Sequence, residues 1–313
     1  MKIYEYPWDK RPDGISGCVL ALGFFDGMHA AHRDLISFAA SEARSLGMPL
    51  GIFTFKPTGK IKPDSERIYS EHDKIALMQS LGTDFIINAD FSRLCDATAE
   101  DFVRDVIARD IGASTCVVGY NFRFGKGAAA GADDLVALMR EVGKNALIRE
   151  EFEIDGTAVS ASRIRELIKI GDMETARRLL GMPYFIRGRV SHGNRDGRRI
   201  GYPTINISIQ DGALVPRLGV YRSAVEVDGE LHPAITNIGT CPTFKERQVH
   251  SETYILDFEG DLYGREMRVY LLEFLRDERK FTSPEQLAQQ IKHDTQMILD
   301  KKGDLTWQAL GLS

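Results

Sequence analysis

The residues best suited to chemistry lie in the segment from Gly188 to Asn206, GRVSHGNRDGRRIGYPTIN. Five arginines fall between residues 187 and 199, opposed there only by Asp196. Glycine lets backbone N–H groups approach an anion, and arginine supplies planar charged donors. Thr204 and Asn206 then offer oxygen ligands that suit Mg²⁺, a hard cation. The segment predicts a nucleotide phosphate site; a glycine-rich surface hairpin with solvated charges is the plain alternative.

A second group lies near the N-terminus, where His29 and His32 follow the apolar run Cys18–Gly23. Residues three apart in a helix share one face, so the two imidazoles are expected side by side. They also stand at the N-terminal end of the predicted helix, where free N–H groups and the helix dipole favour phosphate. The spacing therefore predicts a second phosphate site, with helix capping or core packing as the alternative.

Short apolar runs alternate with helical patterns through the first half of the chain. This alternation predicts βαβ units and a mainly parallel sheet, which binds ligands beyond the carboxyl ends of its strands. The predicted strands are Cys18–Gly23, Gly51–Phe55, Phe85–Ala89 and Cys116–Gly119. The predicted helices lie near His29–Leu46, Glu71–Leu81, Ala99–Ile111 and Asp133–Val142.

A helical pair is predicted over residues 160–181. Gly171 breaks the pattern, Asp172 can cap the second helix, and Gly181 can end it. We expect a domain boundary near Met182–Pro183, which divides the chain into residues 1–183 and 184–313.

The second half shows closely spaced strand patterns separated by turn residues, which predict a small antiparallel β-barrel. Ser283 and Pro284 predict the N-cap and first residue of a final helix. The expected fold class is therefore α/β plus all-β, with a Rossmann-like N-terminal domain, a C-terminal barrel and a terminal helix. The predicted barrel strands include Tyr221–Val227, Ala234–Ile238, Glu252–Phe258 and Met267–Phe274.

Composition narrows the function classes. The 313 residues are 43% hydrophobic, enough for two cores, and the net charge of -5 argues against a general nucleic-acid or membrane-surface binder. The four cysteines lack metal-ligand spacing, and Cys18 and Cys116 are expected to be buried free thiols, as in a reducing cytosol. No signal-peptide pattern and no run of 18 apolar residues is visible, so we expect a cytoplasmic protein without a membrane span.

The second half resembles the riboflavin kinases over about residues 184–300. Residues 188–206 resemble that family's ATP-binding segment, Gly-x-Val-x-x-Gly-x-x-x-Gly-Arg-x-Ile-Gly-Tyr-Pro-Thr-x-Asn. Further motifs occur in the family's order, at Gly219–Tyr221, Asn237–Phe244, Ser251–Phe258, Asp261–Gly264 and Leu275–Phe281. The resemblance implies ATP-dependent phosphorylation of riboflavin, a small molecule, to FMN.

The riboflavin kinase resemblance also implies roles for single residues. Thr204 and Asn206 are expected to hold Mg²⁺ and the ATP phosphates, and Glu252 to orient and deprotonate the attacking hydroxyl. Arg276 is expected to close over the flavin, and Tyr254 stands where the family often has histidine. The loop residues expected to contact the nucleotide are Gly193, Gly197 and Arg198.

The first half resembles the adenylyltransferases over about residues 15–182. Gly23–His32 is similar to the signature Gly-x-Phe-Asp-Gly-x-His-x-Gly-His, and Gly119–Gly125 and Val159–Arg165 are similar to two later motifs. With the kinase half, this resembles the bacterial bifunctional riboflavin kinase/FMN adenylyltransferases, or FAD synthetases. The resemblance implies that FMN phosphate attacks the α-phosphate of ATP and pyrophosphate leaves. The expected nucleotide contacts are His29, His32, Asn121, Ser160, Ser162 and Arg163.

This half departs from the family pattern at Phe24, Ala31, Thr58, Asn121 and Ala128, which stand in place of Asn, Gly, His, Asp and Arg. Because single transition-state donors are commonly worth about 2.7–4 kcal/mol, slower adenylyl transfer is expected. One alternative is a riboflavin kinase with an inactive N-terminal domain. Another is a flavin-sensing regulator without turnover, which would have no need of Glu252. The sequence does not indicate an oligomeric state.

Overall fold

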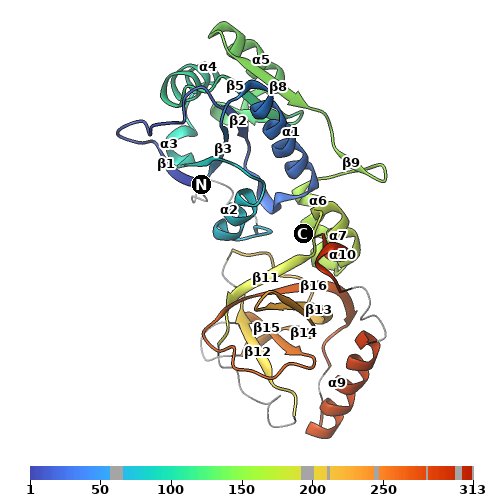
Figure 1. Ribbon diagram of the computed structural model, residues 1–313. Helices are drawn as coiled ribbons and strands as arrows, with labels where there is room; N and C mark the ends of the chain where they lie inside the picture. Colours follow the sequence, from blue (N-terminus) through green and yellow to red (C-terminus); the bar gives the residue numbers. More distant parts are fainter. Residues whose placement is uncertain are drawn as a thin grey trace. The chain divides into compact units, whose positions relative to one another are not determined.

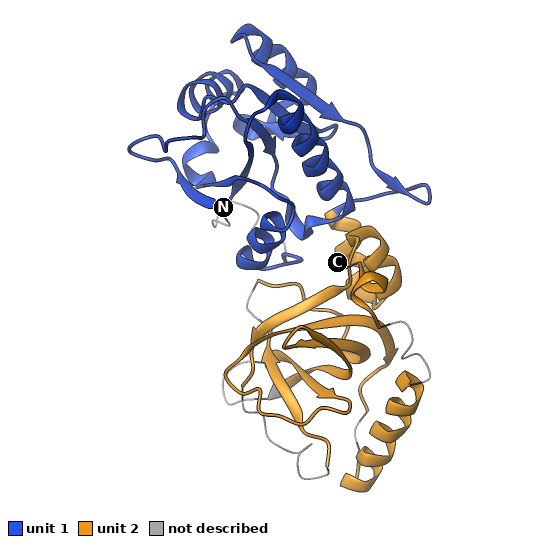
Figure 2. Ribbon diagram, viewed as in Figure 1, with its two compact units in different colours: residues 1–160 blue, residues 161–313 orange. Residues whose placement is uncertain are grey.

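The computed structural model describes residues 1–56, 66–191, 201–209, 212–242, 247–279, 281–299 and 305–311. The chain divides into two compact units, residues 1–160 (unit 1) and residues 161–313 (unit 2), which Figure 2 colours separately. No helix in these ranges is long and apolar enough to cross a membrane.

Unit 1 is built on a parallel six-stranded sheet, as predicted, in the order β1-β4-β3-β2-β5-β8 (Figure 1). The inner strands β2 and β5 are buried along almost their whole length, as expected for strands covered on both faces. The edge strands β1 and β8 were not predicted, because their short, mixed polar sequences lack an apolar run. The strands are β1 (Lys2–Tyr6), β2 (Val19–Leu22), β3 (Leu50–Phe55), β4 (Phe85–Ala89), β5 (Thr115–Gly119) and β8 (Asn145–Arg149).

The helices of unit 1 confirm the predicted alternation, although residues 102–111 adopt π-helical geometry. They are η1 (Asp26–Met28), α1 (Ala30–Leu46), α2 (Glu71–Gln79), α3 (Phe91–Leu94), α4 (Ala99–Asp101), η2 (Phe102–Ile111), η3 (Lys126–Ala128) and α5 (Ala132–Glu141). Two small hairpins complete the unit, β6 (Arg123–Phe124) with β7 (Ala130–Gly131), and β9 (Glu153–Ile154) with β10 (Thr157–Ala158).

The strand order of unit 1 reverses between β2 and β5. From β2 the chain proceeds outward to β3 and β4, and β5 then pairs on the other side of β2. Ligands of open α/β sheets bind at such a reversal, beyond the carboxyl ends of the strands. The core beneath it includes Cys18 and Cys116, both buried free thiols as predicted. Burial raises the pKa of Cys18 to about 12, so this thiol stays protonated and inert.

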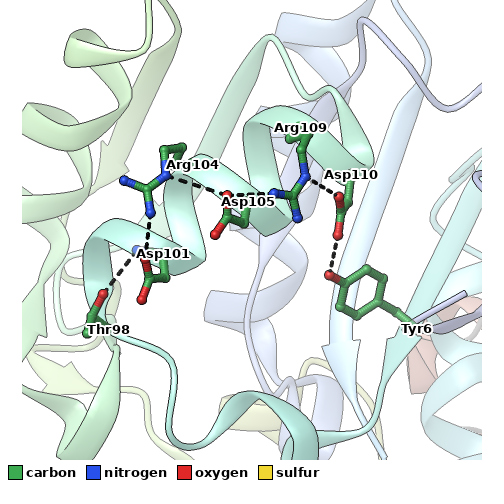
Figure 3. A network of polar contacts seen from close by, with 7 residues as sticks. All are labelled: Tyr6, Thr98, Asp101, Arg104, Asp105, Arg109 and Asp110. Carbon is green, nitrogen blue, oxygen red and sulfur yellow. Dashed lines mark hydrogen bonds and ion pairs between the residues drawn. The ribbon is translucent and has the colours of Figure 1, made fainter.

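A network of polar groups fastens the edge strand β1 to the helix formed by α4 and η2 (Figure 3). The Tyr6 hydroxyl donates to Asp110 at 2.8 Å, and Arg109 bridges Asp110 and Asp105 at 2.8 Å each. Arg104 continues the network to Asp101 at 2.6 Å. Exposed ion pairs contribute little to stability, so the bond from the buried Tyr6 is the part that fixes the strand.

Unit 2 begins with α6 (Ala161–Ile170) and α7 (Met173–Leu180), the predicted helical pair. Asp172 caps α7 by accepting from the Thr175 N–H at 3.1 Å, and Gly181 ends it with positive φ, as predicted. The remaining elements are β11 (Tyr184–Arg189), β12 (Thr204–Ser208), β13 (Gly219–Val227), β14 (Glu230–Pro242), β15 (Arg247–Ile255), β16 (Glu266–Arg276), α9 (Pro284–Leu299) and α10 (Trp307–Leu310).

The six strands of unit 2 form the predicted antiparallel barrel, in the order β11-β16-β13-β14-β15-β12. The two outer strands meet where Ser191 N–H donates to the Asn206 carbonyl at 2.9 Å, which closes the sheet on itself. Buried hydroxyls of Ser223, Thr236 and Thr253 bond in sequence across β13, β14 and β15 at 2.7 and 2.9 Å.

One detail of the barrel differs from the sequence prediction. β15 spans Arg247–Ile255, so Glu252 lies in the middle of a strand instead of at its start. Polar residues, among them His250 and Glu252, weakened the strand pattern in the sequence. In the structure their side chains face outward from β15. The terminal helix α9 begins at Pro284 as predicted, and Ser283 Oγ accepts from the Gln286 N–H at 3.4 Å.

Candidate functional site

Unit 1 places its histidines by a strained turn at the carboxyl end of β2. Phe25 is buried with a left-handed φ of 55°, and Gly27 has φ 78°. A Cβ at Gly27 would lie 2.6 Å from Ile68 Cδ1, so both its conformation and its neighbour require glycine. The turn ends at His29, which occupies the N-cap position of α1. The first N–H groups of α1 are therefore presented at the edge of the sheet where ligands bind.

The two histidines lie together, as the sequence predicted. Their rings stack with centroids 3.5 Å apart and planes 19° apart, and the Phe25 ring stands edge-on to His32. Burial lowers the pKa of His29 to about 4, and burial together with the neighbouring His29 lowers the pKa of His32 well below its ordinary value. Both imidazoles are thus neutral at pH 7, and the covered Nδ1 of each has no hydrogen-bond partner in the described part of the chain.

Asn121 lies just beyond the carboxyl end of β5, the strand that flanks β2 at the reversal of strand order. A Cβ built on Gly119 would lie 3.4 Å from Asn121 Oδ1 and 3.8 Å from Leu35 on α1. The turn after β5 and helix α1 therefore adjoin, which brings Asn121 to the same edge of the sheet as the histidine pair. The amide supplies both a donor and an acceptor there.

A buried lysine that the sequence analysis missed supports this edge. Lys74, on α2, donates to Thr54 Oγ1 at 3.2 Å and to the Phe55 carbonyl at 3.1 Å, and pairs with Glu71 at 3.0 Å. Thr54 in turn donates to the Phe24 carbonyl at 3.1 Å. The ammonium therefore ties the end of β3 to the turn after β2. In sequence, Lys74 is a single lysine in a helix that is about half apolar. Sequence alone cannot distinguish such a lysine from one on the surface.

The remaining predicted contacts of the first site follow one another in the chain, where unit 1 ends and unit 2 begins. Ser160 is the last residue of unit 1, whereas Ser162 and Arg163 lie in the first turn of α6 in unit 2. Arg163 pairs with Glu166 at 3.4 Å, and Ser162 Oγ accepts from Arg165 at 3.2 Å. Thr58 falls outside the described residues.

The register of unit 2 places the predicted kinase residues on one face of the barrel. Asn206 on β12 pairs with Glu252 on β15, which pairs with Asn237 on β14. Thr204 pairs with Tyr254 two residues along. Directly paired residues of antiparallel strands point to the same side, so all five side chains share the outer face. The intervening residues fill the barrel interior.

Two cavities adjoin this face. One of about 280 Å³ is lined by Thr204, Asn206 and residues 258–260, 262 and 263. The other, of about 230 Å³, is lined by Thr204, Glu252, Arg276 and residues of α9. Thr204 lines both, so this predicted metal and phosphate ligand stands between the two spaces, whereas Asn206 lines the first alone. The nucleotide loop residues Gly193, Gly197 and Arg198 fall outside the described part of the chain.

Two further residues, one beside Glu252 and one beside Arg276, were not predicted. His250 Nε2 lies 3.6 Å from Glu252 Oε1, two residues before the glutamate, whereas the family often has histidine two residues after it. Asp294 on α9 is 2% exposed and bonds Arg276 through Nε and Nη2, at 3.1 and 2.8 Å. The alternation of β15 was the available signal for His250. For Asp294 there was none, because a single aspartate in an amphipathic helix is ordinarily solvated.

Comparison with known proteins decides the family. The sequence matches the family model for riboflavin kinase over residues 180–301 and that for FAD synthetase over residues 12–163. The bifunctional riboflavin kinase/FMN adenylyltransferase of Bacillus subtilis (strain 168) is 33% identical over 288 residues, 89% of this chain and 90% of that protein. The chain belongs to this family of bifunctional riboflavin kinase/FMN adenylyltransferases.

Other relatives of the bifunctional enzyme agree. The protein of the same name from Escherichia coli (strain K12) is 33% identical over 292 residues, again 89% of this chain and 90% of that protein. A crystal structure from Streptococcus pneumoniae has a TM-score of 0.85 at 31% identity and covers 95% of this chain and 98% of that one. That protein is described as a macrolide-efflux protein, so this match supports the fold of the chain and not its activity.

Both family domains are present, so the bifunctional enzyme is a transferase of flavin cofactor synthesis. The alternative of a kinase with an inactive N-terminal domain is not favoured, because the relatives matched over both halves carry the bifunctional name. The departures at Phe24 and Asn121 lie within a fully formed edge of the sheet. Phe24 packs against Phe55 with ring centroids 4.8 Å apart, so the change from a polar residue extends an aromatic cluster.

Proposed function

We propose that the barrel of unit 2 transfers the γ-phosphoryl group of ATP to the 5′-hydroxyl of riboflavin. One observation supports this above all: Thr204, Asn206 and Glu252 share one face of the barrel, and Thr204 lines both adjoining cavities. Phosphoryl transfer requires a triphosphate and a hydroxyl placed in line. We assign the triphosphate to the cavity of Thr204 and Asn206, and the flavin to the cavity of Glu252 and Arg276.

Glu252 is the proposed base. Its side chain is 39% exposed and lines the flavin cavity, so the carboxyl oxygens can reach a hydroxyl bound there. It accepts the proton that the ribityl hydroxyl loses as the new P–O bond forms. His250, 3.6 Å away, can hold the carboxylate in orientation.

The residues present fit a magnesium ion bound together with ATP. Thr204 offers a hydroxyl oxygen and Asn206, 7% exposed, an amide oxygen, both on the face that lines the phosphate cavity. Such neutral oxygen ligands suit Mg²⁺ that also binds substrate phosphates. Bound there, the ion would neutralise charge on the transferred phosphoryl group.

We further propose that unit 1 adenylylates FMN to FAD. The FMN phosphate attacks the α-phosphate of ATP, and pyrophosphate leaves with the electron pair of the broken P–O bond. His29 and His32 contribute as neutral donors at the N-terminus of α1, joined by Asn121. From the family resemblance, Ser160, Ser162 and Arg163 are proposed to bind the leaving pyrophosphate. The loop residues Gly193, Gly197 and Arg198 are likewise proposed for the kinase nucleotide.

In functional terms we place the division between the two activities at residues 1–183 and 184–313. The family models leave residues 164–179, which hold most of the helical pair, between the two matches. The buried free thiols suit a reducing compartment, which agrees with action in the cytoplasm on riboflavin, FMN and ATP as small-molecule substrates.

A product assay tests both halves of the proposal. The full chain is incubated with ATP, Mg²⁺ and either riboflavin or FMN, and the flavins are separated by chromatography. We expect FMN and then FAD from riboflavin, FAD from FMN, and neither product when a chelator removes the metal. FMN accumulation without FAD at any metal concentration would overturn the assignment of unit 1. Absence of FMN would overturn that of unit 2.

A further inference from the structure

The guanidinium of Arg276 is held by one side chain from another element. Arg276 lies at the end of β16, and its Nε and Nη2 donate to Asp294 Oδ2 at 3.1 and 2.8 Å. Its Nη1 donates to the Asp277 carbonyl at 3.2 Å. A guanidinium has five N–H groups. Two of them therefore take part in no hydrogen bond within the described part of the chain.

Asp294 is unusual for the helix that carries it. Within α9 the buried residues are Asp294 and Ile298. Besides Arg276, Asp294 accepts from Gln290 Nε2 at 2.8 Å, one turn earlier. A buried carboxylate is costly unless it is paired, and an apolar residue would attach the helix to the barrel as well or better. Packing of α9 therefore does not account for an aspartate at this position.

The backbone of Arg276 is fixed as well. Gly219, at the start of β13, has φ 143°, and a Cβ there would lie 2.5 Å from the Arg276 carbonyl oxygen and 2.7 Å from the Phe274 ring. Only glycine allows β13 to approach this closely. Backbone and side chain of Arg276 are thus positioned independently, the first by Gly219 and the second by Asp294.

Both members of the pair line the cavity of about 230 Å³ that also contains Glu252 and Thr204. We propose that Asp294 is a positioning residue for riboflavin, which orients the Arg276 guanidinium so that its remaining N–H groups meet oxygen acceptors of the flavin. The inference rests on the proposed kinase function of this cavity. Its effect is specific to the flavin, because the ATP phosphates are assigned to the other side of Thr204.

The test compares Asp294→Asn with wild type in the full chain. Asparagine keeps the size of the side chain but loses the negative charge that holds a guanidinium in a bidentate contact. Riboflavin affinity, measured by quenching of flavin fluorescence without ATP, is expected to weaken at least about tenfold. The KM for riboflavin should rise alike, while the KM for ATP stays within about twofold, a split that general loosening of the barrel would not produce.

A double-mutant cycle separates positioning from helix attachment. If Asp294 acts through Arg276, then Arg276→Ala weakens riboflavin binding by about as much as Asp294→Asn does. Adding Asp294→Asn to Arg276→Ala then causes no further loss of riboflavin affinity. Gln290→Met is the matched control, because it removes the other partner of Asp294 and leaves Arg276 in place. It is expected to change riboflavin affinity less than about threefold. If Asp294→Asn folds poorly, the double variant Asp294→Leu, Arg276→Met is used in its place. It fills the site with apolar atoms and leaves no buried charge unpaired.

Unchanged riboflavin affinity in Asp294→Asn, or additive losses in the cycle, would overturn the inference while FMN formation by wild type left the kinase function standing. If riboflavin binding by the wild type depends on Asp294 but no FMN forms, the kinase function is overturned and the inference stands. Failure of the wild type to bind riboflavin would overturn both.

Discussion

The edge of the sheet in unit 1 and the outer face of the barrel in unit 2 are both assigned to ATP, yet their side chains differ in charge. In unit 1 the central groups are His29 and His32, which burial keeps neutral at pH 7. In unit 2 the cavity assigned to the flavin is lined by charged groups, among them the carboxyl groups of Glu252 and Asp294 and the guanidinium of Arg276. A neutral pair in one unit and a charged set in the other thus serve the synthesis of the same cofactor.

The nucleophiles explain this difference. In adenylyl transfer the attacking group is a phosphate, which already carries negative charge and needs no base. Neutral donors at a helix N-terminus can stabilise the crowded phosphates without removing a proton. In the kinase reaction the attacking group is an alcohol, which must lose its proton, so a carboxylate is required within reach. The state of the nucleophile, and not the shared ATP, determines the side-chain chemistry of each site.

The largest effect expected from this comparison is that of Glu252→Gln. The amide keeps the shape of the side chain but cannot accept the hydroxyl proton, so FMN formation should fall by about 10²–10⁴-fold. FAD formation from supplied FMN should stay within about twofold of wild type, because that reaction needs no base. Both rates are measured in the same preparation by chromatography. Equal loss of both activities would contradict the comparison, and retained kinase activity would remove Glu252 from its role.

The converse change is His32→Ala, which should affect unit 1 alone. Loss of one donor to the transition state commonly costs about 10²–10³-fold in rate, and FAD formation from FMN should fall by this amount. FMN formation should not change. His232→Ala is the control, since His232 lies on β14 of unit 2 with its ring against Phe258. If His32→Ala left FAD formation intact, the histidine pair would be a packing feature of the turn.

The two sites also differ in how far sequence could predict them. His29 and His32 adjoin in space because His29 is the N-cap of α1 and His32 lies three residues on, in the first turn, which is a local property. The kinase residues come from β12, β15 and β16, and what joins them is register. Asn206 faces Glu252 only because the strands pair as they do. The resemblance to the riboflavin kinases brought these residues together in the prediction. Composition alone could not have paired them.

Residues that act through a partner were the ones missed. Lys74 and Asp294 are both buried charges whose partners lie on other elements, Thr54 and Phe55 for the first and Arg276 for the second. In sequence each resembles an ordinary solvated residue of an amphipathic helix. The edge strands β1 and β8 were missed for a related reason, since their place in the sheet depends on neighbours and not on an apolar run of their own.

Lys74→Met tests whether the edge of unit 1 depends on a buried charge as unit 2 does. The change deprives Glu71, Thr54 and the Phe55 carbonyl of their donor, and should lower the unfolding free energy of unit 1 by about 3 kcal/mol. The exposed Lys10→Met is the control. Urea unfolding is followed by Trp8 fluorescence in a Trp307→Phe background, which leaves one tryptophan of the chain's two. A loss no larger than that of the control would show that the ammonium is dispensable.

The smallest effect concerns pH. The folded-state pKa of His29, about 4, lies below the ordinary value of 6.5, so between these values the unfolded chain binds a proton that the folded unit does not. Stability from this group is therefore complete above pH 6.5 and declines as the pH falls towards 4. Lowering the pH from 7 to 5.5 should cost about 1 kcal/mol of unfolding free energy through His29. His29→Gln removes this titration, so the difference between wild type and variant, measured with Trp8, isolates it. A difference independent of pH would mean that the pKa of His29 is the same in the folded and the unfolded chain, as for a solvated imidazole. The contrast between neutral donors in unit 1 and carboxylates in unit 2 would then no longer hold.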